Sequence, residues 1–291
     1  MPSNAKIENK VTRGAYLYKQ KTMSWRGNSI AYYDVGEGYP LLIIHGWGGN
    51  GYDYIKLIPG LEGSFRVLIP DMPGSGCSAK PRIHYTFDLF LDFLEEFLNE
   101  MGVRSFHLAG HSLGGHLSVH LIKRDPKRVN RLVLLAPTGL RGQEGFNGWI
   151  SKLGPLVDLS ARINNRWLVR FFARRNAFYD ATQVTPDYLE RIYSSFLTPE
   201  ARYSIACTAQ TVVGTNPIDD ILPTLSHPTL IIWGTKDRLF PYRRWSTRYQ
   251  ELLVNSSLVL IENCGHTLTF ERADDALKAM RPFLLGLDKS N

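Results

Sequence analysis

The stretch that decides the fold is FHLAGHSLGGHLSVHLI, residues 106–122. Its apolar start, 106–109, is typical of a buried strand, and 113–122 has the apolar spacing of a helix. Between them, the residues Gly-His-Ser-Leu-Gly at 110–114 fit the G-x-S-x-G pattern of a nucleophile elbow, a sharp strand-to-helix turn that exposes a serine. Glycines on both sides give the turn the steric room that it needs. The sequence therefore predicts a nucleophile, Ser112, at the end of a buried strand.

Similar apolar runs recur on both sides of this stretch. Most are bounded by Gly, Pro or Asp, and they lie at 41–44, 67–69, 132–135, 230–233 and 258–261. Near-continuous apolar strands are typical of a parallel sheet that is covered on both faces. Helical spacing at 87–101 and 273–285 supplies elements for that cover. The pattern predicts an α/β fold with a doubly wound sheet.

The alternation of strand and helix stops after Pro137. Residues 138–224 show helical patterns, many arginines and aromatic residues, and no convincing strand. The alternation then resumes at 230–233. We therefore expect a core made of 1–137 and 225–291, with 138–224 inserted as a helical cap.

A serine hydroxyl needs a base, and the chain has eight histidines. His266 follows the last predicted strand, and open α/β sheets gather their reactive groups at the carboxyl ends of strands. Asp237 follows the strand at 230–233, where a carboxylate can orient the imidazole and stabilise its charged form. We expect Ser112, Asp237 and His266 to act as nucleophile, acid and base.

The developing oxyanion needs two backbone donors. His-Gly-Trp-Gly-Gly at 45–49 follows the strand at 41–44, where this kind of elbow takes its second donor. We expect the N–H groups of Trp47 and Leu113 to form the oxyanion hole. Gly48 is an alternative to Trp47, and the sequence does not choose between them.

Taken together, these motifs resemble those of the α/β-hydrolase superfamily over nearly the whole chain. The matching blocks are 45–46, 71–76 with Ser78, 110–114, 234–237 and 265–266. The resemblance implies a mostly parallel, eight-stranded sheet and maps the family's nucleophile, acid, base and oxyanion residue onto Ser112, Asp237, His266 and Trp47. It also implies that 71–76 is a structural turn.

Within the superfamily, the blocks 132–140, 231–237 and 262–272 are similar to capped monoacylglycerol-lipase-like esterases. That likeness implies a serine hydrolase acting on a small-molecule substrate, a small or acyl-chain ester such as an acylglycerol. An alternative is a carbon–carbon bond hydrolase of ring-fission diketones, although such enzymes usually carry an aromatic residue where Thr267 stands. A second alternative is a hydrolase-like receptor that only binds its ligand. A complete triad disfavours the receptor.

Four arginines recur at every fourth position of the expected cap, beside several aromatic residues, and the net charge is +7. We expect a helix that packs its apolar side, including Trp167 and Phe171, over the active site with its arginines in solvent. The alternative is a weak contact with anionic membrane surfaces. The arginines are Arg162, Arg166, Arg170 and Arg174.

Other classes of function find little support. The three cysteines, Cys77, Cys207 and Cys264, have unrelated spacings that suggest neither disulfides nor zinc. His116 and His120 lie one helical turn apart but lack a carboxylate companion, so we expect no metal. We also expect no cofactor and no nucleic-acid partner. The amino terminus has no apolar leader and no run is long enough to span a bilayer, so a cytoplasmic location is expected.

Overall fold

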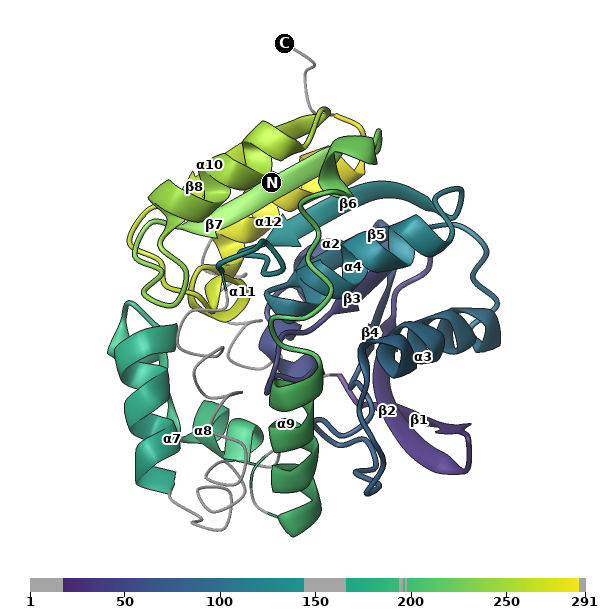
Figure 1. Cartoon of the computed structure of the whole chain (residues 1–291), viewed down its shortest axis with the longest axis vertical. Helices are drawn as coiled ribbons and strands as arrows, with labels where there is room; N and C mark the ends of the chain where they lie inside the picture. The colour runs from purple at the N-terminus through teal and green to yellow at the C-terminus, as the bar shows by residue number, and fades with distance from the viewer. Residues whose placement is uncertain (1–17, 144–165, 194–195, 197, 288–291) are drawn as a thin grey trace.

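The computed structural model describes residues 18–143, 166–193, 196 and 198–287, and its centre is one sheet (Figure 1). Its eight strands lie in the order β1-β2-β4-β3-β5-β6-β7-β8. β2 is antiparallel to β1 and β4, whereas β3 to β8 run parallel to one another. The strands are β1 (Lys21–Trp25), β2 (Asn28–Val35), β3 (Tyr39–Ile44), β4 (Phe65–Pro70), β5 (Phe106–His111), β6 (Val129–Leu135), β7 (Thr229–Gly234) and β8 (Ser256–Ile261).

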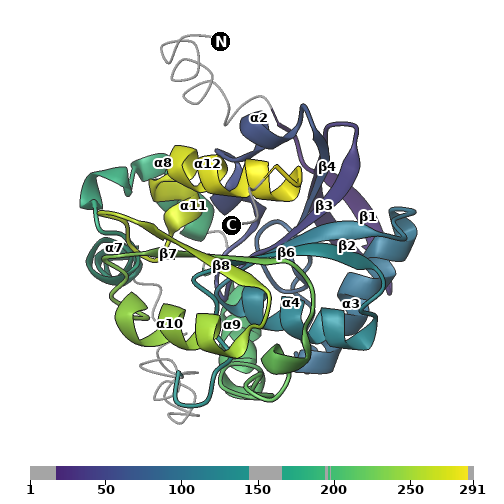
Figure 2. The ribbon, with the colours of Figure 1, turned by 90° about the horizontal axis from the view of Figure 1, so that it is seen from above.

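Helices cover both faces of the sheet, as Figure 2 shows. The helices on one face are α3 (Phe87–Glu100), α4 (Leu113–Arg124) and α10 (Tyr242–Leu252). Those on the other face are α2 (Ile58–Leu61), α11 (Leu268–Glu271) and α12 (Ala273–Leu284). The predicted doubly wound, mostly parallel, eight-stranded α/β fold is therefore confirmed.

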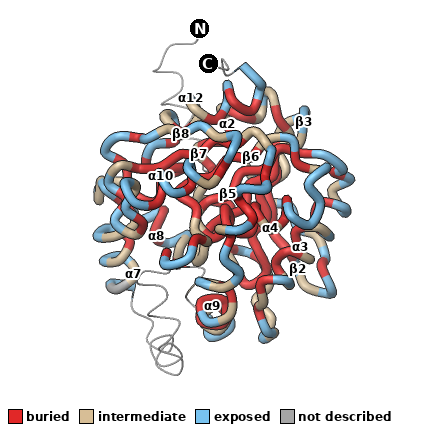
Figure 3. The backbone as a smooth tube through the Cα atoms, turned by 45° about the horizontal axis from the view of Figure 1, so that its top comes forward, coloured by how far each residue is buried: buried red, intermediate tan, exposed pale blue. Residues whose placement is uncertain are grey.

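The central strands are buried along their whole length (Figure 3). Every residue of β5 and β7 is buried, because both faces of these strands are covered. This is why consecutive apolar residues, rather than alternating ones, marked the strands in the sequence. Each of the strands expected from such runs lies within an observed strand.

The helix α3 shows how local signals set an element's limits. The hydroxyl of Thr86 accepts a hydrogen bond from the N–H of Leu89 at 3.1 Å and so caps the first turn. The apolar residues at helical spacing, such as Phe90 and Leu94, are buried against the core. Gly102, with φ +67°, follows the last turn in a conformation that favours glycine.

The sequence did not predict strands β1 and β2. They form a hairpin with a two-residue turn at Arg26 and Gly27, whose φ angles are 47° and 75°. β1 is mostly exposed, so no apolar run marks it. In a sequence, such a hairpin is marked by alternating apolar and polar residues on both sides of a short turn. That alternation is weak in β1 and β2.

Between β6 and β7, the described residues form helices and no strand. We refer to α7, α8, α9 and the turns that connect them as the helical insert, which lies below the sheet in the view of Figure 1. Its elements are α7 (Arg166–Phe172), a π-helical turn η2 (Ala173–Ala177), η3 (Ala181–Gln183), α8 (Pro186–Tyr193) and α9 (Pro199–Thr211). The division at 137/138 and 224/225 stays a prediction.

The orientation of α7 differs from the expected one. Trp167 and Phe171 are 66% and 49% exposed, so they do not pack over the active site. Val169 and Ala173 turn inward instead and contact the core. Helical periodicity alone cannot decide which side of a helix faces the protein when apolar residues lie on both sides. Arg162, the first of the four arginines expected on this helix, lies outside the described residues.

Candidate active site

Ser112 sits at the junction of β5 and α4, in the strained backbone that its sequence context predicts. Its φ and ψ angles are 52° and −118°, a region that residues with a side chain rarely adopt. A Cβ on Gly114 would overlap the carbonyl oxygen of Ile44, and one on Gly110 would overlap that of Gly114. Both positions therefore require glycine, because a side chain would collide with neighbouring backbone oxygens. The turn holds Ser112 above the carboxyl end of the sheet.

Asp237 and His266, which are distant in sequence, are hydrogen bonded. The Nδ1 of His266 lies 2.8 Å from the Oδ2 of Asp237, and both side chains are buried. The other carboxylate oxygen, Oδ1, accepts the N–H groups of Leu239 and Phe240, each at 2.9 Å. These bonds fix the carboxylate, and the carboxylate favours the tautomer with a proton on Nδ1. The Nε2 of His266 is then the nitrogen that can accept a proton.

The loop of His266 is attached directly to the elbow. The Nε2 of His111, the neighbour of Ser112, lies 2.9 Å from the carbonyl oxygen of His266, and the two rings are 4.7 Å apart. Burial and the nearby His266 lower the pKa of His111 to about 3. His111 is therefore neutral at pH 7 and donates this bond. The structure thus brings the segments of Ser112, His266 and Asp237 together.

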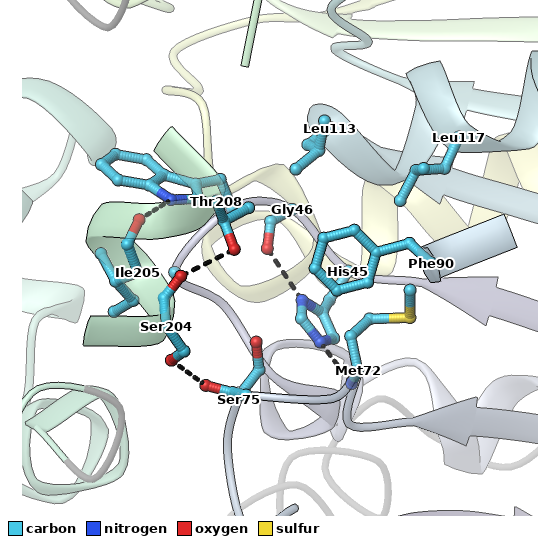
Figure 4. Close-up of a pocket in the computed structure, with 13 residues that line it drawn as sticks. His45, Gly46, Met72, Ser75, Phe90, Leu113, Leu117, Ser204, Ile205 and Thr208 are labelled. Atoms are coloured by element: carbon cyan, nitrogen blue, oxygen red, sulfur yellow. Dashed lines mark hydrogen bonds between the residues drawn. The ribbon is translucent and has the colours of Figure 1, made fainter. Parts of the chain in front are cut away.

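The loop after β3 lies against the elbow on its other side. Here the Nε2 of His45 accepts the N–H of Met72 at 3.0 Å, and its Nδ1 lies 2.8 Å from the carbonyl oxygen of Gly46 (Figure 4). Burial lowers the pKa of His45, so the ring serves as a neutral bridge. A Cβ on Gly46 would come within 3.1 Å of the Cβ of Ser112. This bridge fixes the loop beside Ser112.

The residues of the two predicted oxyanion donors line a common hollow. Among the described residues, neither the N–H of Trp47 nor that of Leu113 has a hydrogen-bond acceptor. Both residues line the same hollow as Ser112. Gly48, the alternative to Trp47, lines only the neighbouring hollow. The choice between Trp47 and Gly48 as the second donor stays a prediction.

Two hollows meet at Trp47 and Leu113. The serine cleft, an open hollow of about 480 Å³, is lined among others by Ser112, His116, Leu140 and Phe240. The apolar pocket, of about 360 Å³, is lined among others by Met72, Phe90, Leu117 and Ile205 (Figure 4). No lysine, arginine, aspartate or glutamate belongs to the described lining of either hollow.

His116, the one histidine in the described lining of the serine cleft, is uncharged at pH 7. Burial lowers the pKa of His116 to about 4. Its Nε2 lies 2.7 Å from the carbonyl oxygen of Asn216, and that of His120 lies 2.9 Å from the same oxygen. The two rings therefore donate to a backbone carbonyl. The described part of the serine cleft is electrically neutral.

A buried carboxylate that the sequence analysis missed supports the loop of His266. Glu271 accepts the N–H of Gly265 at 2.7 Å with Oε2 and the N–H of Asp180 at 2.6 Å with Oε1. The carbonyl oxygen of Ala177 accepts the N–H of His266 at 2.8 Å and that of Thr267 at 3.1 Å. The helical insert and the loop are thus locked together. No local sequence pattern announces such bonds, because their partners lie far apart in the chain.

The helical insert also contacts the loops after β3 and β4. The indole N–H of Trp47 donates to the carbonyl oxygen of Ile205 at 3.2 Å, and the hydroxyl of Ser204 donates to that of Gly74 at 2.7 Å. The hydroxyl of Tyr188 is hydrogen bonded to the carboxyl group of Asp53, whose pKa burial raises to about 6. The insert therefore contacts both loops that flank Ser112.

Metal-ligating side chains do not gather in groups of three or more within the described parts of the chain. His116 and His120 are adjacent, but both direct a ring nitrogen to Asn216. None of the helices in the described ranges has the length and apolar character that crossing a bilayer requires.

Comparison with known proteins places the fold in a family. Residues 39–273 match the family model described as alpha/beta hydrolase fold. The chain is 26% identical to Lipase 3 of Moraxella sp. (strain TA144) over 259 residues, covering 87% of this chain and 79% of the relative. It is 28% identical to 2-hydroxymuconate semialdehyde hydrolase of Pseudomonas sp. (strain CF600) over 268 residues, covering 88% of this chain and 90% of the relative.

The solved structures include a bacterial membrane phospholipase A. It superposes with a TM-score of 0.80 at 26% identity, covering 98% of this chain and 92% of that protein. The relatives thus include lipases and a 2-hydroxymuconate semialdehyde hydrolase. From the match over residues 39–273, this chain belongs to the alpha/beta hydrolase fold family.

Proposed function

We propose that the chain is a serine hydrolase that cleaves carboxylic esters with uncharged acyl chains, acylglycerols among them, through an acyl-enzyme. The observation that carries the proposal is the arrangement around Ser112. A strained elbow holds this hydroxyl at a cleft whose described lining is uncharged, and the buried Asp237 orients His266 on the adjoining loop. This combination suits an acyl transfer to serine.

In the first half of the proposed reaction, the Oγ of Ser112 attacks the acyl carbonyl carbon while the Nε2 of His266 takes its proton. The carbonyl oxygen becomes negatively charged, and the N–H groups of Trp47 and Leu113 donate to it. The carboxylate of Asp237 stabilises the imidazolium across the 2.8 Å bond. The carbon–oxygen bond to the leaving group then breaks, and the alcohol departs with the proton from His266.

In the second half, water replaces the alcohol. His266 takes a proton from the water as its oxygen attacks the acyl carbon. The oxyanion forms again at the same donors and collapses with return of the proton to the Oγ of Ser112. The products of this half are a carboxylic acid and the free enzyme, so the proposed reaction consumes only the ester and water and requires no cofactor.

The two hollows suit the two halves of an ester. Trp47 and Leu113 line both, so a carbonyl oxygen bound between their N–H groups would lie where the hollows meet. The apolar pocket offers Phe90, Leu117 and Ile205 to an acyl chain. The serine cleft, which has the larger volume, is then available to the leaving alcohol.

The lack of charge in the cleft supports esters over ring-fission diketones. One relative is named 2-hydroxy-6-oxo-2,4-heptadienoate hydrolase, and a dienoate carries a carboxylate. Burying an unpaired carboxylate costs several kcal/mol, so a site for it needs a cation or several donors. The described lining of the cleft offers no lysine or arginine. Neutral esters therefore fit better.

Carbon–carbon bond hydrolysis is the second candidate. It is favoured by the 28% identity with 2-hydroxymuconate semialdehyde hydrolase, a likeness as close as that with the lipases. Thr267 follows His266 here, where enzymes of that class usually carry an aromatic residue. The third candidate is a receptor that retains the fold and binds without turnover.

A substrate panel separates the three candidates. The purified chain is assayed with p-nitrophenyl esters from acetate to laurate, with a monoacylglycerol, and with a ring-fission dienoate. Ser112→Ala is the control for chemistry at the serine. We expect turnover of the esters and its loss in the variant. A higher kcat/KM for the dienoate would favour carbon–carbon cleavage, and binding or slow acylation without turnover would favour a receptor.

A further inference from the structure

The outer side of α7 carries two exposed aromatic rings. Trp167 is 66% exposed and Phe171 is 49% exposed. Their ring centroids are 5.5 Å apart and the planes differ by 18°, so the two rings stack on each other. Large aromatic side chains of this kind are usually covered in a folded protein. Here they project outward as a pair.

Arginines share this side of the helix with the rings. Positions three and four apart lie on one helical face, so Trp167, Arg170 and Phe171 form a single stripe, and Arg174 follows in the adjoining turn η2. All four are exposed, as is Arg166 beside them. Arg166 pairs with Glu190 at 3.3 Å, whereas Arg170 and Arg174 form no ion pair with any described residue. We refer to these five residues as the α7 face.

We propose that the α7 face docks on the surface of a bilayer that contains anionic phospholipid. Indole and phenyl rings favour the boundary between headgroups and acyl chains. Arginine side chains can extend from that depth toward the lipid phosphates and pair with them. A bilayer offers both environments in one plane, which matches the mixing of rings and guanidinium groups on one stripe. The positive net charge of +7 adds long-range attraction to such a surface.

Docking at this face would hold the proposed active site at the membrane. The helix α7 leads directly into η2, and the carbonyl oxygen of Ala177 at the end of η2 accepts the N–H groups of His266 and Thr267. The docking face and the loop of His266 thus belong to one hydrogen-bonded unit. The supply of membrane esters to the cleft rests on the proposed function, but docking itself does not require catalysis.

The test measures binding in protein that cannot turn lipid over. The Ser112→Ala variant is sedimented with vesicles of phosphatidylcholine, alone or mixed with phosphatidylglycerol, at low and high salt. Two pairs of substitutions are compared in this background: Trp167→Ser with Phe171→Ser, and Arg170→Gln with Arg174→Gln. Each arginine near an anionic surface contributes about 1 kcal/mol, so losing two should weaken partitioning about 30-fold at low salt.

The matched controls remove similar groups elsewhere. Val254, which is 72% exposed, is changed to Ser, and the exposed Arg104 is changed to Gln. We expect binding that needs phosphatidylglycerol, weakens with salt, drops in both α7-face pairs and persists in both controls. No binding, equal binding to neutral vesicles, or wild-type binding by either α7-face pair would overturn the proposal.

A second readout separates docking from catalysis. The same pairs are placed in the chain with Ser112 intact, and hydrolysis of a soluble ester is compared with hydrolysis of an ester held in anionic vesicles. Soluble turnover should stay near the wild-type rate while vesicle turnover falls. Loss of turnover on both substrates would contradict a docking role for these side chains. Failure of the wild type on every ester would count against the proposed function, with the sedimentation result unaffected.

Discussion

The carboxylate of Glu271 offers a sharp test of how the loop of His266 is held. It accepts two backbone N–H groups, those of Gly265 at 2.7 Å and Asp180 at 2.6 Å, and the side chain is buried. Hydrogen bonds to a charged group contribute about 1.5–3 kcal/mol each, so Glu271→Ala should reduce the free energy of unfolding by about 3–6 kcal/mol. Glu271→Gln keeps one acceptor oxygen and should lose about half of that.

The same change should slow the chemistry more than it weakens binding. Gly265 immediately precedes His266, so a released loop moves the imidazole while the hollows that we propose bind substrate stay intact. We expect kcat to fall at least about tenfold in Glu271→Ala, since small errors in position are costly in catalysis. KM should stay within about twofold of the wild type.

The assays are urea unfolding, and ester hydrolysis at a temperature where every variant is folded. Glu262→Gln is the matched control, because Glu262 lies just before this loop but makes only an exposed bond with Thr235. It should keep both stability and kcat. Unchanged stability and kcat in Glu271→Ala, or equal losses in the Glu262→Gln control, would refute the reasoning.

Three further predictions concern Asp53, Ile205 and Asp237. Burial raises the pKa of Asp53 from 3.8 to about 6, so the folded chain holds this proton more tightly than the unfolded chain. The free energy of unfolding should therefore fall by about 2 kcal/mol between pH 4 and pH 7 through this group, and urea unfolding of Asp53→Asn should lack that slope. Ile205→Trp should fill the apolar pocket and lower kcat/KM for laurate at least about tenfold, with little effect on acetate, as a chain-length series will show. Asp237→Asn should lower kcat about 10⁴-fold in the ester assay because its amide favours the wrong tautomer of His266, with circular dichroism confirming the fold.

The sheet and the reactive segments were predictable because their signals are local. Ser112 lies in a turn whose geometry requires the glycines beside it, and the strand runs record burial on both faces. Asp237 and His266 were located by their places after two such strands, and the structure joins them by a hydrogen bond. Their roles in a reaction stay predictions until they are measured.

The remainder depends on contacts between distant parts of the chain. Glu271 and Ala177 support the loop of His266 through backbone groups, which leave no residue-type pattern in the sequence. The outward orientation of Trp167 was missed because the periodicity of α7 gives two apolar sides and the packing of Val169 decides between them. The hairpin of β1 was missed because its exposed residues form no apolar run.

The central claim is that Ser112 becomes acylated during ester hydrolysis. The most direct measurement is a rapid-quench reaction with a p-nitrophenyl ester, followed by mass spectrometry of the peptide that contains residues 106–122. The account predicts a burst of p-nitrophenol and an acyl group on Ser112, both absent in Ser112→Ala. Ester turnover that persists in Ser112→Ala, or that proceeds in the wild type with no acylated peptide and no burst, would contradict it.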